Sequence, residues 1–409
     1  MESTTETITN TVKQDMERAY EENELEGCQQ VIQKKLEQWR HTPMKMAITG
    51  QSGAGKSTLI NALRGLSADD DGAAPVGSTE TTKTISEYPH PDNDQLVFSD
   101  LPGVGTTKFP KQSYIDEISA DKFDFFLLLA QKRFLETDMW LAEELLKRKK
   151  GFFLVRTHMA EEVANDKRAH PKSQCTEVEL VAQIRVDMET HLSELGTATP
   201  TSLRVFLIDS HEQGKYDFPD LQRQLIDNFP ALKQEALLLS LGATNRAMVD
   251  QKAKCLKSRI WKAAAMSAGI AAVPIPGTSL AADIAILLHE TRFYFHQFGL
   301  DTTSLRRLAL WSEVKYNELD AVVTREFGVD VMTLEAAKFL EFTAALRIPL
   351  GAFAAESVAE EVVNGVPTMG VILSASMSFL TTYWFLRQIL DKMHAVAGEV
   401  YDLAKEQQA

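Results

Sequence analysis

The stretch MKMAITGQSGAGKSTLINALRG, from Met44 to Gly65, decides the fold of the first half of this chain. A short apolar run, Met44 to Thr49, leads into a glycine-rich loop, and the residues from Thr58 to Leu63 have helical spacing. This order of strand, loop and helix N-terminus matches the phosphate-binding P-loop in both pattern and context.

Different residues of this loop are expected to bind different parts of a nucleotide and its Mg²⁺. The glycines let backbone N–H groups turn inward, so that with the helix dipole they form a cradle for phosphate oxygens. Lys56 is expected to reach the outer phosphates, and the Ser57 hydroxyl is expected to bind Mg²⁺. The predicted nucleotide-binding residues of the loop are Gly50, Ser52, Gly53, Ala54, Gly55, Lys56, Ser57 and Thr58.

The composition limits the number of domains, the class of protein and its compartment. At 409 residues the chain exceeds the size at which one core usually stops growing, so we expect more than one domain. The 57 acidic and 43 basic residues give a net charge of −14, which argues against a nucleic-acid binder. The three cysteines are far apart and in no metal-ligand spacing, which favours a reducing cytoplasm.

Residues 43–230 alternate between expected strands and expected helices. The expected strands are Met44–Thr49, Leu96–Ser99, Phe123–Leu129, Phe152–Arg156 and Val205–Asp209. Several are continuous apolar runs, as in a parallel sheet covered on both faces. Helical stretches such as Met139–Lys149 and Thr176–Leu195 lie between them. The pattern predicts an α/β P-loop domain, doubly wound with a mostly parallel sheet, whose ligand lies at the carboxyl ends of the strands.

The two ends of the chain are predicted to be helical. Residues 1–42 form an N-terminal segment whose apolar residues recur every three to four positions between Asn23 and His41. Residues 231–409 change in character to helices alone and are expected to form an all-α domain.

Two uncharged runs in this region are long enough to be candidates for membrane spans. The first, Ala263–Ala282, contains Pro274 and Pro276, so we expect two helices joined by a turn. The second, Gly365–Leu386, is interrupted by polar residues, and we favour a buried helix over membrane insertion.

A second phosphate loop is predicted after the strand that ends at Ser99. Asp100 and Gly103 form the pattern D-x-x-G, in which GTPases use the aspartate to hold Mg²⁺ and the glycine N–H to meet the γ-phosphate. Between the two loops, Thr82 is the expected switch threonine on Mg²⁺, with Thr81 as the alternative. Metal binding is therefore assigned to Ser57, Thr82 and Asp100.

The residue after Gly103 departs from the pattern of many small GTPases. Those proteins have a glutamine there, which orients the attacking water, whereas this chain has Val104. An apolar side chain cannot orient water. Hydrolysis is therefore expected to be slow in a lone monomer and to need another residue or a partner chain.

The expected base-recognition loop also departs from its pattern. Guanine recognition usually uses N/T-K-x-D after an apolar strand, with the carboxylate accepting from guanine N1–H and N2–H. In Thr157-His158-Met159-Ala160, the threonine fits, while His158 and Ala160 replace the lysine and the aspartate.

Other residues near this loop are weaker candidates for the base. Glu161 and Asp166 carry carboxylates, yet neither has the spacing of the missing aspartate. Ser210, after the last expected strand, is predicted to make the final contact on the base side. Guanine specificity is therefore inferred mainly from the neighbouring motifs.

These motifs resemble those of the immunity-related GTPases, the interferon-inducible group of dynamin-like large GTPases. The most specific pieces are GQSGAGKSTLINALRG, DLPGVGTTKFP, the Arg133-Phe134 pair, KYDFP at Lys215 to Pro219 and VPIPGTSLAADIAILL at Val273 to Leu288. Lys56 is similar to the lysine-containing P-loop branch of the family, since the other branch has methionine there.

The resemblance implies a GTPase domain framed by a helical domain built from both chain ends. It implies Mg²⁺ with GTP or GDP, homo-dimers or oligomers formed through the nucleotide face, and hetero-oligomers with related GTPases. It also implies cooperative hydrolysis on oligomerisation, and a cytoplasmic protein that associates peripherally with intracellular or vacuolar membranes in cell-autonomous immunity.

Three residues gain a role only through the resemblance. Glu80 resembles a family glutamate that takes part in hydrolysis across the dimer, and the expected catalytic residues are Lys56, Glu80 and Thr82. Arg133 and Asp138 resemble contacts to the opposite chain or to its nucleotide.

Membrane attachment is expected to use the helical domain. The chain has no glycine after the initiator methionine, so the N-myristoylation motif is absent. The basic face of Met248–Trp261, followed by Ala263–Leu288, is the expected membrane-contacting segment.

Two other functions remain open at this point. Val104 and Ala160 favour a nucleotide-gated regulatory module that binds GTP and hardly hydrolyses it. A P-loop ATPase is the third hypothesis, because the P-loop itself does not select the base.

Overall fold

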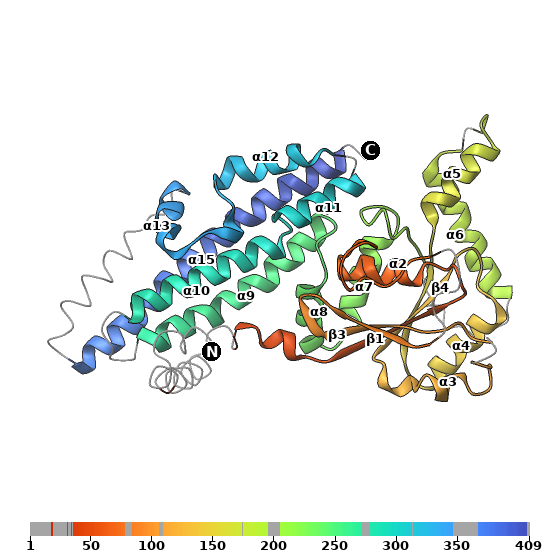
Figure 1. The fold of residues 1–409 in the computed structure, drawn as a ribbon, viewed down its shortest axis with the longest axis horizontal. Helices are drawn as coiled ribbons and strands as arrows, with labels where there is room; N and C mark the ends of the chain where they lie inside the picture. Colours follow the sequence, from red (N-terminus) through yellow and green to blue (C-terminus); the bar gives the residue numbers. More distant parts are fainter. Residues whose placement is uncertain are drawn as a thin grey trace. The chain divides into compact units, whose positions relative to one another are not determined.

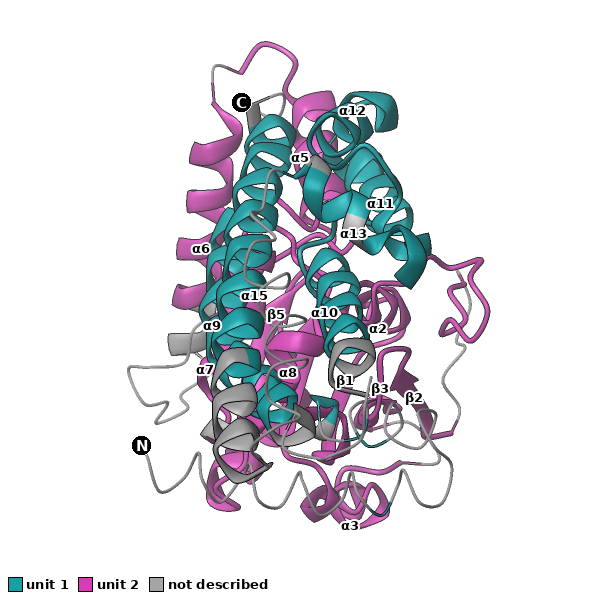
Figure 2. Ribbon diagram, turned by 90° about the vertical axis from the view of Figure 1, so that its left-hand side faces the viewer, with its two compact units in different colours: residues 1–38, 245–409 teal, residues 39–244 magenta. Residues whose placement is uncertain are grey.

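The computed structural model describes residues 18, 31, 34, 36–77, 84–105, 109–173, 175–194, 205–271, 278–312, 314–346 and 367–406. The chain divides into two compact units, coloured separately in Figure 2. One unit is Trp39–Thr244, and the other joins Met1–Gln38 to Asn245–Ala409.

A six-stranded sheet forms the centre of the unit Trp39–Thr244. Its strands are β1 (Met44–Gly50), β2 (Ser86–His90), β3 (Asn93–Asp100), β4 (Phe125–Ala130), β5 (Gly151–Arg156) and β6 (Val205–Leu207). Their order across the sheet is β2-β3-β1-β4-β5-β6, with only the β2–β3 pair antiparallel. The predicted mostly parallel α/β fold is confirmed.

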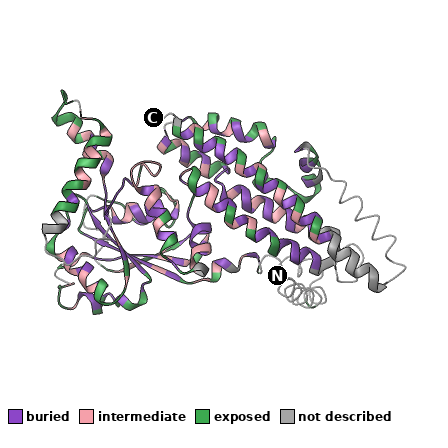
Figure 3. Ribbon diagram, turned by 180° about the vertical axis from the view of Figure 1, so that it is seen from behind, coloured by how far each residue is buried: buried purple, intermediate pink, exposed green. Residues whose placement is uncertain are grey.

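Helices lie on both faces of this sheet (Figure 1). They are α2 (Lys56–Arg64), α3 (Tyr114–Glu117), α4 (Glu136–Lys147), α5 (Met159–Ala169), α6 (Glu177–Glu194), α7 (Phe218–Asp227) and α8 (Ala231–Ser240). Every residue of β4 is buried, and Figure 3 shows the central strands as mainly buried. The apolar runs of these strands follow from this cover, because a strand with no solvent face has no use for polar alternation.

One strand and one strand end differ from the sequence expectation. β2 was not predicted, because it is a short edge strand that contains Pro89 and alternates between exposed and less exposed residues. The strand expected over Val205–Asp209 ends at Leu207. The Asp209 side chain instead accepts hydrogen bonds from the backbone N–H groups of Ala160, in the first turn of α5, and of His211.

Helices α9 (Arg246–Ala271), α10 (Thr278–Gln297), α11 (Thr302–Ser312), α12 (Tyr316–Phe327), α13 (Ala336–Ala345) and α15 (Pro367–Glu406) form the other unit, with the short turn η3 (Val331–Thr333). Helices α9, α10 and α15 pack against one another along their lengths (Figure 1). The predicted turn with Pro274 and Pro276 lies outside the described residues.

From Pro367 onwards, the second uncharged run belongs to α15, which continues beyond the run to Glu406. Gly365, where the run begins, lies outside the described residues. Phe385 and Leu386 within it are fully buried. Among the residues that the structure describes, no helix combines the length and apolarity that a membrane crossing requires.

The unit boundary falls later than the expected boundary after residue 230. Helix α8 packs on β3, and Asn93 Nδ2 donates to Ser240 Oγ at 3.1 Å. The two compact units consequently divide after Thr244.

The expected basic face of α9 is smaller than its sequence suggests. Lys252 is buried, and its Nζ donates to Gln297 Oε1 at 2.7 Å. Arg259 is buried as well, because α9 is covered by two other helices. Lys254, on the same helix, is exposed.

A buried ion pair joins α9 to α10. Arg259 Nε lies 2.9 Å from Glu290 Oε2, and Arg259 Nη2 lies 2.8 Å from Glu290 Oε1. The guanidinium also donates to the carbonyl of Leu36 and stacks 4.3 Å from the ring of Phe293. This cluster therefore binds the segment before the P-loop domain to the helical unit.

Replacing Glu290 with leucine is expected to lower the free energy of unfolding by about 3–5 kcal/mol, because it leaves a buried guanidinium without its carboxylate. Urea unfolding followed by circular dichroism measures the change. The double variant Arg259→Met/Glu290→Leu removes both charges and is expected to recover most of the loss. A single variant within about 0.5 kcal/mol of the parent would contradict this account.

Candidate nucleotide-binding site

The P-loop connects β1 to α2 in a conformation that requires glycine at two positions. A Cβ on Gly50 would lie 2.2 Å from the carbonyl oxygen of Leu129 on β4, so no larger residue fits. Gly55, which caps the N-terminus of α2, has φ 75°, where side chains are strained. A loop with glycine at such positions can turn its backbone N–H groups towards a phosphate.

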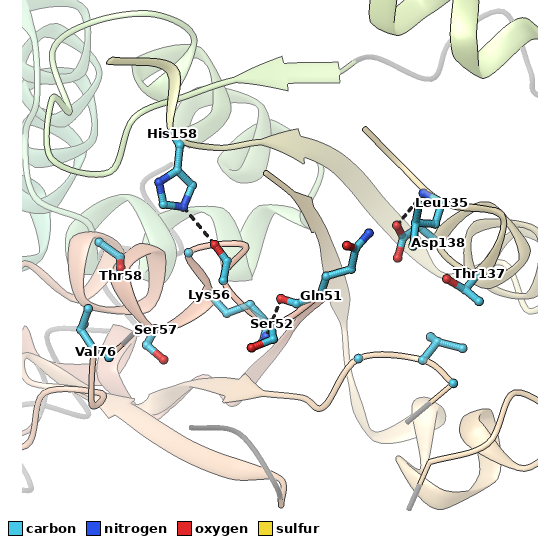
Figure 4. A pocket seen from close by; sticks show the side chains of 16 residues that line it. Gln51, Ser52, Lys56, Ser57, Thr58, Val76, Leu135, Thr137, Asp138 and His158 are labelled. Carbon is cyan, nitrogen blue, oxygen red and sulfur yellow. Dashed lines mark hydrogen bonds between the residues drawn. The ribbon is translucent and has the colours of Figure 1, made fainter. Parts of the chain in front are cut away.

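A cavity of about 320 Å³ opens over this loop (Figure 4). Its lining comprises Gln51, Ser52, Gly53, Gly55, Lys56, Ser57, Thr58, Val76, Gly77, Gly103, Val104, Gly105, Leu135, Thr137, Asp138 and His158. The P-loop, the D-x-x-G loop and the loop after β5 therefore meet at the carboxyl edge of the sheet, as the sequence predicts for a ligand site.

Lys56 is held over the P-loop. Its Nζ donates to the carbonyl oxygens of Gly50 and Gln51, each at 3.1 Å, and the residue is buried. A largely desolvated ammonium beside a phosphate cradle interacts more strongly with phosphate than an exposed one does.

Ser57 and Asp100 come together as expected for a Mg²⁺ site. Ser57 Oγ donates to Asp100 Oδ2 at 3.2 Å, and Asp100 is buried. The parallel pairing of β1 with β3, in which Ile48 lies beside Asp100, brings the two loops to one edge. Both side chains offer oxygen ligands, and Mg²⁺ is usually held by one or two such groups together with phosphate and water. The predicted residues Glu80, Thr81 and Thr82 lie outside the described residues.

The second phosphate loop lies against the first. A Cβ on Gly103 would lie 3.1 Å from the carbonyl oxygen of Gly50, so the close approach favours glycine. Val104 also lines the cavity, and it packs on the hydrophobic core beneath. Its side chain offers no hydrogen bond to a water molecule at the phosphate end.

The loop after β5 is bonded directly to the P-loop. Thr157 Oγ1 donates to the carbonyl oxygen of Ala54 at 3.0 Å. His158 has φ 60°, and its Nε2 lies 3.1 Å from the carbonyl oxygen of Gly53. Figure 4 shows the His158 ring pointing towards the P-loop. Histidine therefore makes a contact with the P-loop from the position where the usual pattern has lysine.

The other predicted residues lie in different surroundings. Ser210 is half-buried and is not part of the described cavity lining. Arg133 is exposed and pairs with Asp187 at 3.3 Å. Asp138 is buried at the N-terminus of α4, where its Oδ2 accepts from the backbone N–H of Leu135 at 2.9 Å. Burial raises the pKa of this carboxyl.

Sequence reasoning missed several residues of the cavity. Leu135 and Thr137 come from the start of α4, and Val76 and Gly77 come from the loop before β2. The one available signal was topological, because α4 begins at the same edge of the sheet as the P-loop.

The fold and this site define a P-loop nucleotide-binding domain of the GTPase type. The family model described as "Interferon-inducible GTPase (IIGP)" matches residues 9–336. The chain therefore belongs to the interferon-inducible GTPase family, and the predicted resemblance is confirmed.

Relatives cover most of the chain. "T-cell-specific guanine nucleotide triphosphate-binding protein 2" from Mus musculus is 37% identical over 290 residues, which are 71% of this chain and 68% of that protein. "Interferon-inducible GTPase 5" from Rattus norvegicus is 32% identical over 391 residues, 95% of this chain and 81% of that protein. The solved structure of NFeoB from S. thermophilus bound to GDP.AlF4- and K+ is 15% identical with a TM-score of 0.29, covering 85% and 99% of the two chains.

Replacing Lys56 with alanine is expected to weaken triphosphate binding by about 10- to 100-fold, since charge-assisted contacts to phosphate are lost. Equilibrium dialysis with GTP and Mg²⁺ measures the affinity. Lys172→Ala removes an exposed lysine outside the described cavity lining and serves as the matched control. Equal affinity for GTP in Lys56→Ala and in the control would contradict the assignment.

Proposed function

We propose that this chain is a Mg²⁺-dependent GTP-binding and GTP-hydrolysing protein that pairs through its nucleotide face and acts at intracellular membranes. The observation that carries the nucleotide part is the contact of Ser57 Oγ with Asp100 Oδ2 at 3.2 Å, beside the buried Lys56. This is the arrangement that switch-type GTPases use for Mg²⁺ and phosphate.

Pairing through the nucleotide face is supported by the rim of the cavity. Val76 and Leu135 both line it, and they are 49% and 50% exposed. Exposed apolar side chains around a polar cavity fit the burial that a protein–protein contact provides. Arg133, which is exposed, and Asp138, in the cavity lining, are the proposed contacts to the second copy or its nucleotide.

Pairing also offers a route to hydrolysis. Val104 lies where a water-orienting side chain would be required, so we assign that task to Glu80 acting across the dimer. The monomer is then a slow GTPase whose rate rises with self-association.

Membrane action is proposed for the helical unit. Trp261 on α9 makes edge-to-face contacts with Phe379 and Tyr383 of α15 at centroid distances of 5.0 and 6.0 Å, and Leu380 and Trp384 on α15 are exposed. Aromatic side chains of this kind favour the boundary between lipid and water. Peripheral association with vacuolar membranes, in cell-autonomous immunity, is the proposed setting.

The specific hydrolysis rate is expected to rise with protein concentration, because each active site is completed by a second chain. The variant Glu80→Ala is expected to keep GTP affinity within about threefold while lowering turnover by about 10- to 100-fold, the usual contribution of a group that prepares the attacking water. Phosphate release at a series of protein concentrations measures both effects.

Mixing two inactive variants separates action across the dimer from action within one chain. Lys56→Ala keeps Glu80, and Glu80→Ala keeps the nucleotide site, so their mixture is expected to regain part of the turnover. The dimer mechanism would be ruled out if the turnover of the mixture equals the sum of the two variants measured separately and does not depend on protein concentration. That result would favour the alternative of a weakly hydrolysing regulatory module, which Val104 also motivates.

A further inference from the structure

We propose that Asp209 supplies the carboxylate that recognises the guanine base, in place of the aspartate that the usual pattern has at Ala160. The inference rests on the proposed function, because it concerns the base of a nucleotide held by the P-loop.

The structure places the Asp209 carboxylate beside Ala160, where the usual pattern has an aspartate. Asp209 follows β6, and its Oδ2 accepts from the backbone N–H of Ala160 at 3.1 Å. Its Oδ1 accepts from the backbone N–H of His211 at 2.9 Å. A carboxylate thus contacts the backbone of Ala160, whose own side chain carries none.

The same loop connects Asp209 to the nucleotide cavity. Ala160 stands two residues after His158, which lines the cavity and lies 3.1 Å from the carbonyl oxygen of Gly53. Thr157 bonds to the next P-loop residue, Ala54, at 3.0 Å. The parallel pairing of β5 with β6 fixes both strand ends at this edge of the sheet. Asp209 and Ala160 are themselves outside the described cavity lining, so in this proposal the base reaches Asp209 by extending past His158 from the phosphates.

Asp209 keeps enough hydrogen-bonding capacity for this task. An ionised carboxylate has about four acceptor positions, and the backbone N–H groups of Ala160 and His211 occupy two. The remaining two match the N1–H and N2–H donors of guanine. Adenine presents an acceptor at N1 instead, so the same carboxylate repels it.

The nearby Glu161 is a poorer candidate. Its side chain is 60% exposed, and its Oε2 lies 3.5 Å from His158 Nδ1. Asp209 is only 6% exposed and is held by two backbone bonds. A fixed carboxylate loses less conformational entropy on binding a ligand than a mobile one.

The test is the variant Asp209→Asn in the full chain, with GTP and XTP competing for binding in the presence of Mg²⁺. Xanthine has a donor at N1 and an acceptor at C2, which a carboxamide matches and a carboxylate does not. The variant is expected to bind GTP about 100-fold more weakly, because the polar groups of the site and the base are then mispaired. The ratio of GTP affinity to XTP affinity is expected to fall towards one.

Asp217→Asn is the matched control. Asp217 also follows β6, and its Oδ2 accepts from the backbone N–H of Leu207 at 2.8 Å and pairs with Arg185 at 2.7 Å. This variant loses a comparable carboxylate that is bonded to Leu207 and Arg185 and not to Ala160, so it is expected to keep the parental preference for GTP.

The outcomes separate the inference from the function on which it rests. A folded Asp209→Asn that keeps the parental ratio of GTP to XTP affinity overturns the inference, and Asp209 then only caps α5. A parent chain that binds no GTP overturns the proposed function itself. If Asp209→Asn does not fold, Asp209→Ser and Ala160→Asp/Asp209→Ser decide. The inference is supported if Asp209→Ser loses the preference for GTP over XTP and the double variant regains it. It is overturned if Asp209→Ser keeps that preference.

Discussion

The close packing of β1 between β3 and β4 is the constraint on which the nucleotide site depends. Gly50 approaches the carbonyl oxygen of Leu129 so closely that a Cβ would lie 2.2 Å from it, and Gly103 packs on Gly50 in turn. Because the three strands are parallel, their ends deliver the P-loop, Asp100 and the start of α4 to one edge. The contact between Ser57 and Asp100 follows from this register rather than from any direct attraction between distant parts of the chain.

The phosphate side and the base side of the site are built differently. On the phosphate side, every described residue that the pattern requires is present, with Lys56 buried over the loop. On the base side, His158 replaces a lysine, and the proposed carboxylate is that of Asp209, which follows β6. Val104 offers no hydrogen bond to a water molecule, and the water-orienting role is proposed for Glu80 of a second copy. In the proposed function, the chain fixes the phosphates by itself, while turnover depends on a second copy.

Local patterns in the sequence predicted the phosphate side, since the P-loop and D-x-x-G signals each lie within a few residues. The buried strands were also predictable, because runs such as Phe125–Ala130 are apolar throughout. The role of Asp209 was not predictable, since its partner Ala160 is 49 residues away and a strand pairing brings them together. Similarly, the sequence suggests that Lys252 is a surface charge, whereas in the structure it is buried and donates to Gln297 of α10, 45 residues away. Edge strand β2, with Pro89, carried too little β signal to be recognised.

The central claim is that this site holds a guanine nucleotide even though Ala160 lacks the usual carboxylate. The most direct measurement is the affinity of the parent chain for GTP and for ATP, each with Mg²⁺, in one competition experiment. The account predicts that GTP binds at least about 100-fold more tightly, because a buried carboxylate rejects a base with the wrong donors. Displacement of GTP by ATP at equal concentration would contradict it.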